Sequence, residues 1–146
     1  MNDTVKKNIM EIVKSCETVT LGTYREIGEY PDLRTILNTL NCENTNLVLH
    51  FFTSNISHKM QQILKKNYCC LYFLNSDTRM ALRLFGTFAI YNEPDKKNYW
   101  RDDWKKFGYS GPEDTRWAVL TFTPKQYKYY TGSTEFAGEI SEDDLN

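Results

Sequence analysis

The sequence lacks a strong net charge, a long hydrophobic run and a paired-cysteine motif, and each absence excludes a class of protein. Its formal net charge is -1, and its lysines stand in scattered doublets rather than in one block, so nucleic acid is a poor candidate partner. Charged residues interrupt the apolar positions of residues 1–17, and no later segment approaches the roughly 18 uninterrupted apolar residues of a membrane helix. We therefore expect neither a signal peptide nor a membrane span.

Four cysteines are present, but their spacing forms no CxxC pair and no zinc pattern. Cys69 and Cys70 are adjacent on a predicted strand, so their side chains fall on opposite faces of the sheet as small buried hydrophobes. His50 lies in the middle of another predicted strand, and no second histidine or carboxylate is placed to complete a metal site. The sequence thus predicts reduced structural thiols, a cytoplasmic protein and no metal.

The side-chain pairs of the common hydrolytic sites are also missing. No serine, cysteine or carboxylate is paired with a base at a recognisable spacing, so hydrolase and acyl-transfer chemistry have no support. Any chemistry would then belong to a cofactor, for which the protein supplies position, hydrogen bonds and a pocket.

What the sequence does contain is enough apolar surface for one domain. Of its 146 residues, 40% are hydrophobic and 14% aromatic, which offsets the entropy of ordering a chain of this length. We expect one domain over residues 1–140 and an acidic, flexible tail over residues 141–146. The apolar spacing predicts a helix over residues 5–16, strands over 19–24, 34–39 and 47–52, a helix that ends near residue 67, strands over 69–74 and 80–91, a helix over 94–107, and strands over 117–122 and 126–130.

The fold class predicted by this order is mainly β (α+β). Consecutive strands joined by short turns favour antiparallel pairing, and about seven strands in so short a chain indicate a closed or nearly closed barrel with helices outside. Gly86, inside the long strand, predicts a bulge or a close approach of two backbones. Trp100 and Trp104 of the predicted 94–107 helix are interpreted as a packing face rather than as a platform for a bound ring.

One stretch carries residues suited to chemistry. In Leu47 to Lys59 a buried strand runs into a turn that holds Thr53, Ser54 and Ser57, followed by His58 and Lys59. Hydroxyls, free N–H groups at a helix N-terminus and a lysine all favour a phosphate. A serine before a helix is also an ordinary N-cap, so phosphate binding and simple capping both remain open on these residues alone.

Four short patterns stand in order along the chain: Arg34-Thr35-Ile36-Leu37, Phe52-Thr53, Ser57-His58-Lys59 and a strand that ends at Gly86. Together they resemble the pyridoxamine 5'-phosphate oxidase-like superfamily of FMN-binding split barrels, in particular its general stress protein branch. The resemblance runs from about Val19 to Gly132. It implies an antiparallel split β-barrel of about six to seven strands with flanking helices, and a homodimer with FMN in clefts between the subunits.

The resemblance also implies which residues contact the cofactor. They are Arg34, Thr35, Ile36 and Leu37, whose strand lines the flavin with backbone amides; Phe52 and Thr53, beside the ring; Ser57, His58 and Lys59, at the phosphate; and Trp117, which opens a late strand near the dimer interface and could reach the partner subunit's flavin.

The chain departs from the family pattern at several of the matching positions. His58 stands where the family has arginine, and because a histidine offers neither a permanent charge nor a bidentate fork, phosphate binding is expected to weaken above neutral pH. Thr39 stands where the vitamin oxidases have a lysine, and Ala81 where they have a glutamine. Arg83 falls on the same strand face as Ala81 and is the candidate substitute for that glutamine as a flavin contact.

The C-terminal stretch from Tyr129 to Phe136 has neither the arginine nor the histidine with which vitamin oxidases hold the vitamin. Oxidation of the vitamin is therefore disfavoured. The leading hypothesis is an FMN-dependent oxidoreductase acting on an unidentified small molecule, with a nicotinamide as one candidate electron donor. The alternatives are a non-catalytic FMN-binding stress or sensor protein, and a haem-binding protein like those of a related branch.

Overall fold

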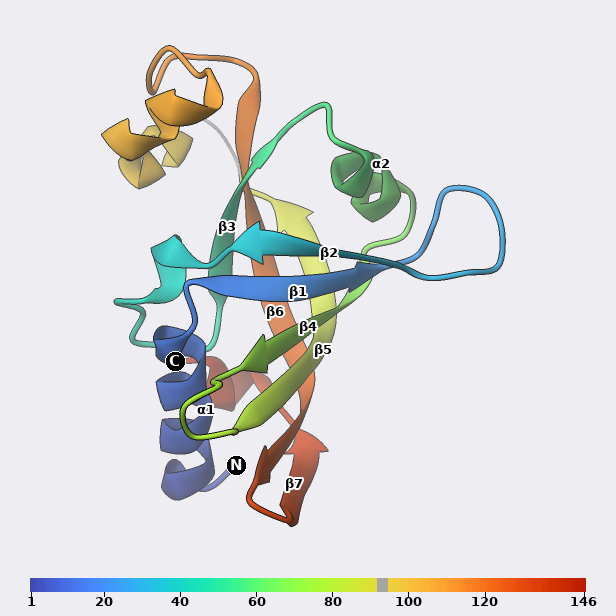
Figure 1. The fold of residues 1–146 in the computed structure, drawn as a ribbon, viewed down its shortest axis with the longest axis vertical. Helices are drawn as coiled ribbons and strands as arrows, with labels where there is room; N and C mark the ends of the chain where they lie inside the picture. Colours follow the sequence, from blue (N-terminus) through green and yellow to red (C-terminus); the bar gives the residue numbers. More distant parts are fainter. Residues whose placement is uncertain (92–94) are drawn as a thin grey trace.

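The structure is a computed structural model that describes residues 1–91 and 95–146 (Figure 1). Its helices are α1 (Asp3–Ser15) and α2 (His58–Lys65), with the short 3-10 helices η1 (Thr39–Asn41), η2 (Asp95–Tyr99), η3 (Asp102–Phe107) and η4 (Glu142–Leu145). Its strands are β1 (Thr18–Thr23), β2 (Asp32–Leu37), β3 (Leu49–Ser54), β4 (Tyr68–Leu74), β5 (Ala81–Ile90), β6 (Trp117–Thr131) and β7 (Thr134–Glu139).

All of these strands belong to one antiparallel sheet. Hydrogen-bonded neighbours follow the order β2-β1-β4-β5-β6-β3, and β7 extends the sheet by pairing with the second half of β6. The sheet curls until its two end strands, β2 and β3, approach one another without pairing (Figure 1). We call this open seam between β2 and β3 the split. The structure thus confirms the expected antiparallel split β-barrel with flanking helices.

The barrel is filled by the inward-facing residues of its strands. In β1, buried Val19 and Leu21 alternate with more exposed residues, which is the period of a strand with one face on a core. Asn2 caps helix α1, and its side chain accepts a hydrogen bond from the N–H of Val5 (2.8 Å). The helix packs its buried side, which includes Ile9, against β4 and β5. Each such buried side chain contributes about 1.5–3 kcal/mol.

The segment predicted as a third helix is not an α-helix in its described part, and Pro94, where that prediction began, lies outside the described residues. The structure has two 3-10 helices here, η2 and η3, separated by Trp100 and Arg101, and Arg101 is extended (φ -126°, ψ 129°). Trp104 is only 2% exposed, so the packing role predicted for this aromatic residue is confirmed. The aromatic spacing is satisfied by packing against the barrel, which overrides the helical periodicity.

The two late strands predicted over 117–122 and 126–130 are one continuous strand, β6. Pro124 has no N–H to donate to a ladder, and the β5–β6 register shifts between Phe85 and Gly86, opposite this proline. A Cβ on residue 86 would lie 2.2 Å from the carbonyl oxygen of Thr123, so only glycine fits. The predicted bulge and close approach at Gly86 are confirmed, whereas the expected break between two strands at 123–125 is wrong, because β6 runs through these residues.

The end of the chain differs most from its sequence pattern. Strand β7 was not predicted, because most of its residues are exposed on both faces and show no alternation. Residues 141–146, expected to be a flexible tail, form η4, in which Ser141 and Asp144 make a capping box. The N–H of Leu47 donates to the carbonyl oxygen of Leu145 (3.0 Å). These contacts oppose mobility of the segment, and its flexibility stays a prediction.

Candidate functional site

The split exposes backbone groups of β2. The N–H of Asn38 donates to the carbonyl oxygen of Glu17 (2.8 Å), which continues the β1–β2 ladder by one pair. Hydrogen-bonded and non-hydrogen-bonded pairs alternate along an antiparallel ladder, so the backbone groups of Ile36 turn toward β1. Those of Thr35 and Leu37 turn toward the split, where they can bond to a ligand.

The opposite side of the split is formed by β3, whose free groups follow from the same alternation. The N–H of Asn55 donates to the carbonyl oxygen of Arg116 (2.9 Å), so the backbone groups of His50 and Phe52 face away from β6. The side chain of Asn41 covers the backbone groups of His50: it accepts from the N–H (2.8 Å) and donates to the carbonyl oxygen (2.9 Å). Phe52 therefore presents its N–H and carbonyl to the open part of the split.

One end of the split is closed by the N-terminus of α2. Ser57 caps this helix: its Oγ accepts from the N–H of Met60 (3.3 Å) and donates to the carbonyl oxygen of Ser54 (3.0 Å). Lys59 Nζ lies 3.5 Å from the same Ser57 Oγ. The N–H groups of His58 and Lys59, in the first turn, have no acceptor within the helix. Hydroxyl, ammonium and free N–H groups thus meet at one point that suits an anion.

Arg34 reaches this end of the barrel from β2 and is firmly held there. Its guanidinium donates to Thr23 Oγ1 (2.7 Å) and Gln62 Oε1 (2.6 Å), and it pairs with Asp32 Oδ2 (3.1 Å). Gln62, buried on α2, also donates to Asp32 Oδ2 and Glu26 Oε2 (3.0 Å each). We call these five residues the arginine network. It ties β1, β2 and α2 together, and sequence reasoning identified only Arg34 in it.

The electrostatics of this end favour a bound anion. Burial, and secondly the positive charge of Arg34, lower the pKa of Lys59. The charged form of Lys59 therefore has an energetic cost in the ligand-free protein. An anion between Arg34 and Lys59 would remove that cost. The carboxylates of the network are already engaged, since hydrogen bonding from Gln62 and the charge of Arg34 lower the pKa of Asp32. These two carboxylates lie with Arg34, whereas Lys59 forms no ion pair with a described residue, so its charge is available to an anion.

His58 does not lie with Lys59 at this point. Its side chain is 89% exposed, and its Nδ1 lies 3.5 Å from Glu26 Oε1, which is long for a hydrogen bond. Glu26 Oε1 has no closer partner among the described residues. The predicted phosphate contact through the His58 side chain therefore requires a change of rotamer, whereas its backbone N–H is already in place.

Phe52 and Thr53 lie where β3 passes from the split to α2. Thr53 is buried, while the ring of Phe52 packs outside the barrel in what we call the aromatic cluster: Phe52, Trp100, Trp104, Tyr109 and Trp117. The Phe52 ring stacks on Trp104 (ring centroids 4.0 Å apart, planes at 19°) and meets Tyr109 edge-on (5.2 Å). Phe52 thus joins the split, through its backbone, to the aromatic cluster, through its ring.

Two predicted residues are not brought to the split. Arg83 lies on the outer face of β5, opposite Tyr72 and Lys128 in register, and donates to Tyr130 Oη (3.2 Å). Trp117 is 1% exposed and packs inside the chain. In this conformation Trp117 offers no surface to a partner's flavin, and it supports Phe52 from below (ring centroids 6.0 Å apart).

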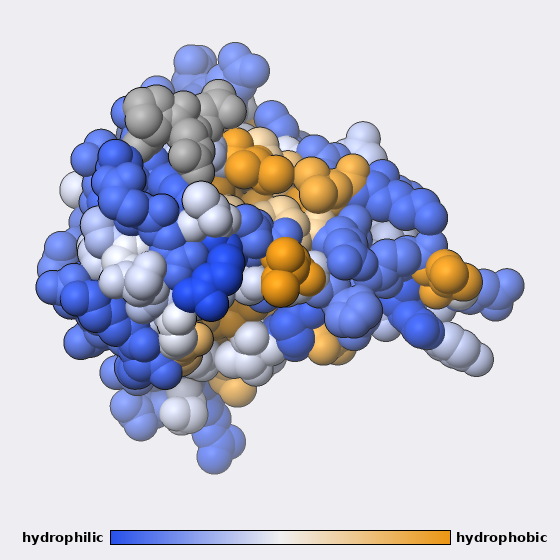
Figure 2. Space-filling model, turned by 90° about the horizontal axis from the view of Figure 1, so that it is seen from above, coloured by the Kyte–Doolittle hydropathy of each residue, from blue (hydrophilic) through white to orange (hydrophobic). Residues whose placement is uncertain are grey.

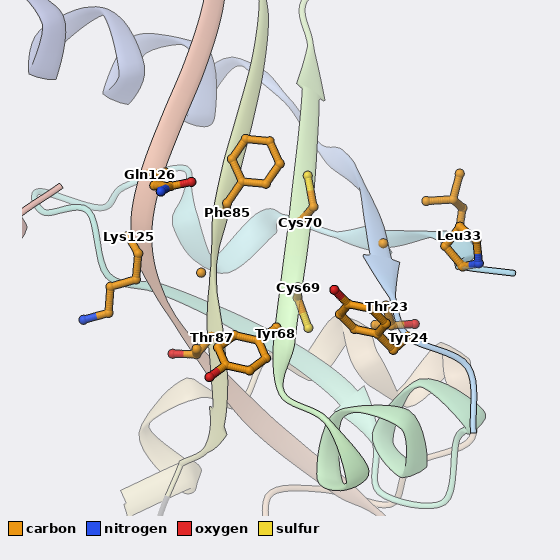
Figure 3. Close-up of a pocket in the computed structure, with 13 residues that line it drawn as sticks. Thr23, Tyr24, Leu33, Tyr68, Cys69, Cys70, Phe85, Thr87, Lys125 and Gln126 are labelled. Atoms are coloured by element: carbon orange, nitrogen blue, oxygen red, sulfur yellow. The ribbon is translucent and has the colours of Figure 1, made fainter. Parts of the chain in front are cut away.

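The outer face of the sheet is hollowed beyond Arg83, which does not itself line the hollow. A groove of about 550 Å³ crosses β1, β4, β5 and β6 (Figure 3), and Leu33, Tyr68 and Tyr24 on its walls are 67%, 60% and 51% exposed. Sequence reasoning missed this outer groove. The signal was in β4, where the outward positions Tyr68, Cys70, Tyr72 and Leu74 are as apolar as the inward ones, the pattern of a strand covered on both faces.

Apolar residues are also exposed at the end of the barrel that carries α2. Figure 2, which views this end, shows hydrophobic side chains gathered among hydrophilic ones. A second groove of about 370 Å³ runs beside α2 and β5, lined by Leu64 and Ile90 among others. Within residues 1–91 and 95–146, no cluster of His, Cys, Asp or Glu could hold a metal ion, and no helix could cross a membrane.

This architecture is similar to that of known proteins. A family model described as pyridoxamine 5'-phosphate oxidase matches residues 5–131. A Clostridium acetobutylicum protein related to general stress protein 26 is similar in structure, with a TM-score of 0.80 and 23% identity over 96% of this chain and 97% of that one. No curated protein matches the sequence significantly.

Two further structural neighbours differ in what they bind. A pyridoxamine 5'-phosphate oxidase-related, FMN binding protein from Nostoc punctiforme has a TM-score of 0.68 and 15% identity over 95% of this chain and 96% of that one. A heme binding protein from Mycobacterium smegmatis has a TM-score of 0.71 and 10% identity over 95% of this chain and 59% of that one. At these identities the likeness shows the fold alone. The family match, which spans most of the sequence, shows that the chain belongs to the pyridoxamine 5'-phosphate oxidase family.

Proposed function

We propose that the chain is an FMN-binding flavoprotein whose cofactor lies along the split. The observation that carries this proposal is the meeting of Lys59 and Ser57 at the N-terminus of α2. Arg34 binds Gln62 on the same helix, and burial, followed by the charge of Arg34, lowers the pKa of Lys59. A terminal phosphate would accept from these groups and from the first-turn N–H groups of α2. The arginine network holds the guanidinium in place before the ligand arrives.

The rest of the split suits the flavin ring. Thr35 and Leu37 on one side and Phe52 on the other present backbone N–H and carbonyl groups that the ladders leave free. The polar edge of an isoalloxazine offers both donors and acceptors to such groups, and buried Ile36 and Thr53 give the strands their fixed positions. When bound, FMN supplies the electron-transfer chemistry, and the protein supplies position and hydrogen bonds.

The outer groove suits a second copy of the chain. Its walls expose Leu33, Tyr68 and Tyr24, and aromatic and aliphatic residues of this kind form the cores of dimer interfaces. Arg83, on the same face, would then approach the flavin held by the partner. We therefore propose a homodimer in which each FMN is completed by both subunits.

The activity that fits best is oxidoreduction of a small molecule other than the vitamin, since the segment after Tyr130 offers no arginine or histidine for a second phosphate. All four cysteines are free thiols, which accords with a reducing cytoplasm. A non-catalytic FMN-binding stress or sensor protein is the alternative, and steady-state NAD(P)H oxidation by the FMN-loaded protein separates the two.

The visible spectrum of the purified protein, followed by calorimetry with FMN and riboflavin, tests the cofactor. We expect flavin absorption bands and a clear preference for FMN, because only FMN carries the phosphate that Arg34 and Lys59 would bind. Equal affinity for riboflavin would contradict the phosphate site. A Soret band in place of flavin bands would replace FMN by haem, and a monomer that still binds flavin would contradict the shared site.

A further inference from the structure

The aromatic cluster forms a continuous contact from the split to the molecular surface. Phe52, whose backbone lines the split, stacks on buried Trp104 at 4.0 Å between ring centroids. Trp104 then meets two other indoles at nearly equal distances, Trp100 at 5.6 Å and Trp117 at 5.8 Å. Indoles are the side chains most easily oxidised by one electron apart from thiolates and tyrosinates. The packing therefore offers two branches along which an electron vacancy at Trp104 could move.

The two branches differ in what surrounds the indole. Trp100 is partly exposed, and its Nε1–H donates to the carboxylate of Asp102 (2.8 Å). An indole radical cation is a strong acid, so a carboxylate on its N–H can take the proton and stabilise the neutral radical. Trp100 is thus equipped to receive the vacancy and retain it.

The indole N–H of Trp117 has the opposite surroundings. Its Nε1 is buried and has no hydrogen-bond partner among the described residues, so its radical cation could not release the proton. The surroundings of Trp117 therefore direct the vacancy away from it and toward Trp100.

We propose that Trp104 and Trp100 form a relay that carries an oxidising equivalent from the light-excited flavin to the surface; this rests on the proposed FMN site. One electron leaves Trp104 for the excited flavin, one electron from Trp100 then refills Trp104, and the proton on Trp100 Nε1 passes to Asp102. The flavin is reduced by one electron, Trp100 is left as a neutral radical, and a dissolved one-electron reductant such as ascorbate or a thiol restores it.

The relay gives the bound flavin a route for electrons that does not pass through its substrate pocket. Without it, the electron vacancy would stay on Trp104, a buried side chain. With it, the vacancy ends at a side chain that solvent can reach, so oxidation is kept away from buried residues of the site.

Transient absorption of the FMN-loaded protein after a light flash tests this, with Trp100→Phe as the variant and Trp117→Phe as the matched control. We expect a long-lived neutral tryptophanyl radical in the unaltered protein and in Trp117→Phe, and its loss in Trp100→Phe. Asp102→Asn should change the transient spectrum to that of the protonated radical cation and shorten its lifetime. Circular dichroism and FMN calorimetry establish that each variant is folded and loaded.

The outcomes separate the relay from the flavin site. A long-lived radical that survives in Trp100→Phe, or that is lost in Trp117→Phe, overturns the relay while FMN binding, measured in the same samples, stands. Failure of the unaltered protein to bind FMN overturns both, since the relay then has no oxidant.

Discussion

Two regions of the molecule, the end of the split and the outer groove, are built on opposite principles. At the end of the split, polar side chains satisfy one another before any ligand binds, as Arg34 does with Thr23 and Gln62. On the outer face, apolar side chains such as Tyr68 are left exposed with nothing to cover them. The first region is pre-organised by bonds within the chain, whereas the second is completed only by association. Substitutions in the two regions should therefore separate folding, ligand binding and assembly.

The largest effect is expected from a charge on the outer face. Tyr68→Glu would bury an unpaired carboxylate in the proposed dimer interface, at a cost of about 2–5 kcal/mol, so light scattering should show a monomer. Folding should change little, because Tyr68 is 60% exposed in the single chain. Ile27→Glu is the control, since Ile27 is 82% exposed and does not line the groove. A persistent Tyr68→Glu dimer would place the interface elsewhere.

The next effect lies in the arginine network. Gln62→Leu would leave Arg34, Glu26 and Asp32 without their shared amide, and each hydrogen bond lost at a buried group costs about 1–3 kcal/mol. We expect the free energy of unfolding to fall by about 3 kcal/mol in a urea titration. Gln61→Leu, next along α2 and exposed, should stay within about 0.5 kcal/mol. Equal effects of the two substitutions would mean that the network does not hold the barrel end.

Lys59→Met separates binding from folding within the split itself. We expect FMN affinity to fall by about 1.5–3 kcal/mol, the scale of a hydrogen bond to a charged group, as measured by calorimetry. The ligand-free variant should be as stable as the unaltered protein or slightly more so, because burial and Arg34 disfavour the Lys59 charge. Lys7→Met, on α1, is the control. A large loss of stability in Lys59→Met would instead make this lysine structural.

The smallest effect is a dependence of stability on alkaline pH. The folded pKa of Lys59 lies below its usual value of 10.5, so between the two values the unfolded chain binds more protons than the folded one. Stability of the ligand-free protein should therefore rise with pH across that interval, relative to Lys59→Met. Bound FMN should abolish the rise by restoring the charge. Parallel pH profiles of the ligand-free protein and Lys59→Met would remove the electrostatic argument.

Local patterns predicted the fold well where side chains alternate or recur strictly. In β1, β3 and β5 buried residues alternate with more exposed ones, and the bulge at Gly86 follows from glycine opposite Pro124, which has no N–H to donate. The helix predicted over residues 95–107 is wrong because the aromatic residues there pack in 3-10 turns, for which apolar spacing gives no signal. Strand β7 gave no sequence pattern because its side chains are almost all exposed.

The candidate site was predictable only in part. Arg34, Ser57 and Lys59 could be found because their short patterns resemble a known family, and the structure brings them to one end of the barrel. The partners that position them, Thr23 and Gln62, could not be found, since their contacts join residues that are far apart in sequence. The open backbone edges likewise depend on which strand pairs with which, and no single segment encodes that.

The side chain of Asn41 covers part of the unpaired strand edge that any open barrel exposes. Free N–H and carbonyl groups on an end strand can pair with another molecule's strand as readily as with a ligand, and this is how sheets begin to aggregate. By bonding to both backbone groups of His50, Asn41 ends the exposed edge of β3 after a short stretch, and Asn44 Nδ2 covers the carbonyl of Val48 (2.8 Å). On β3 the backbone groups of Phe52 remain open, and one residue is too short an edge to start a new strand ladder.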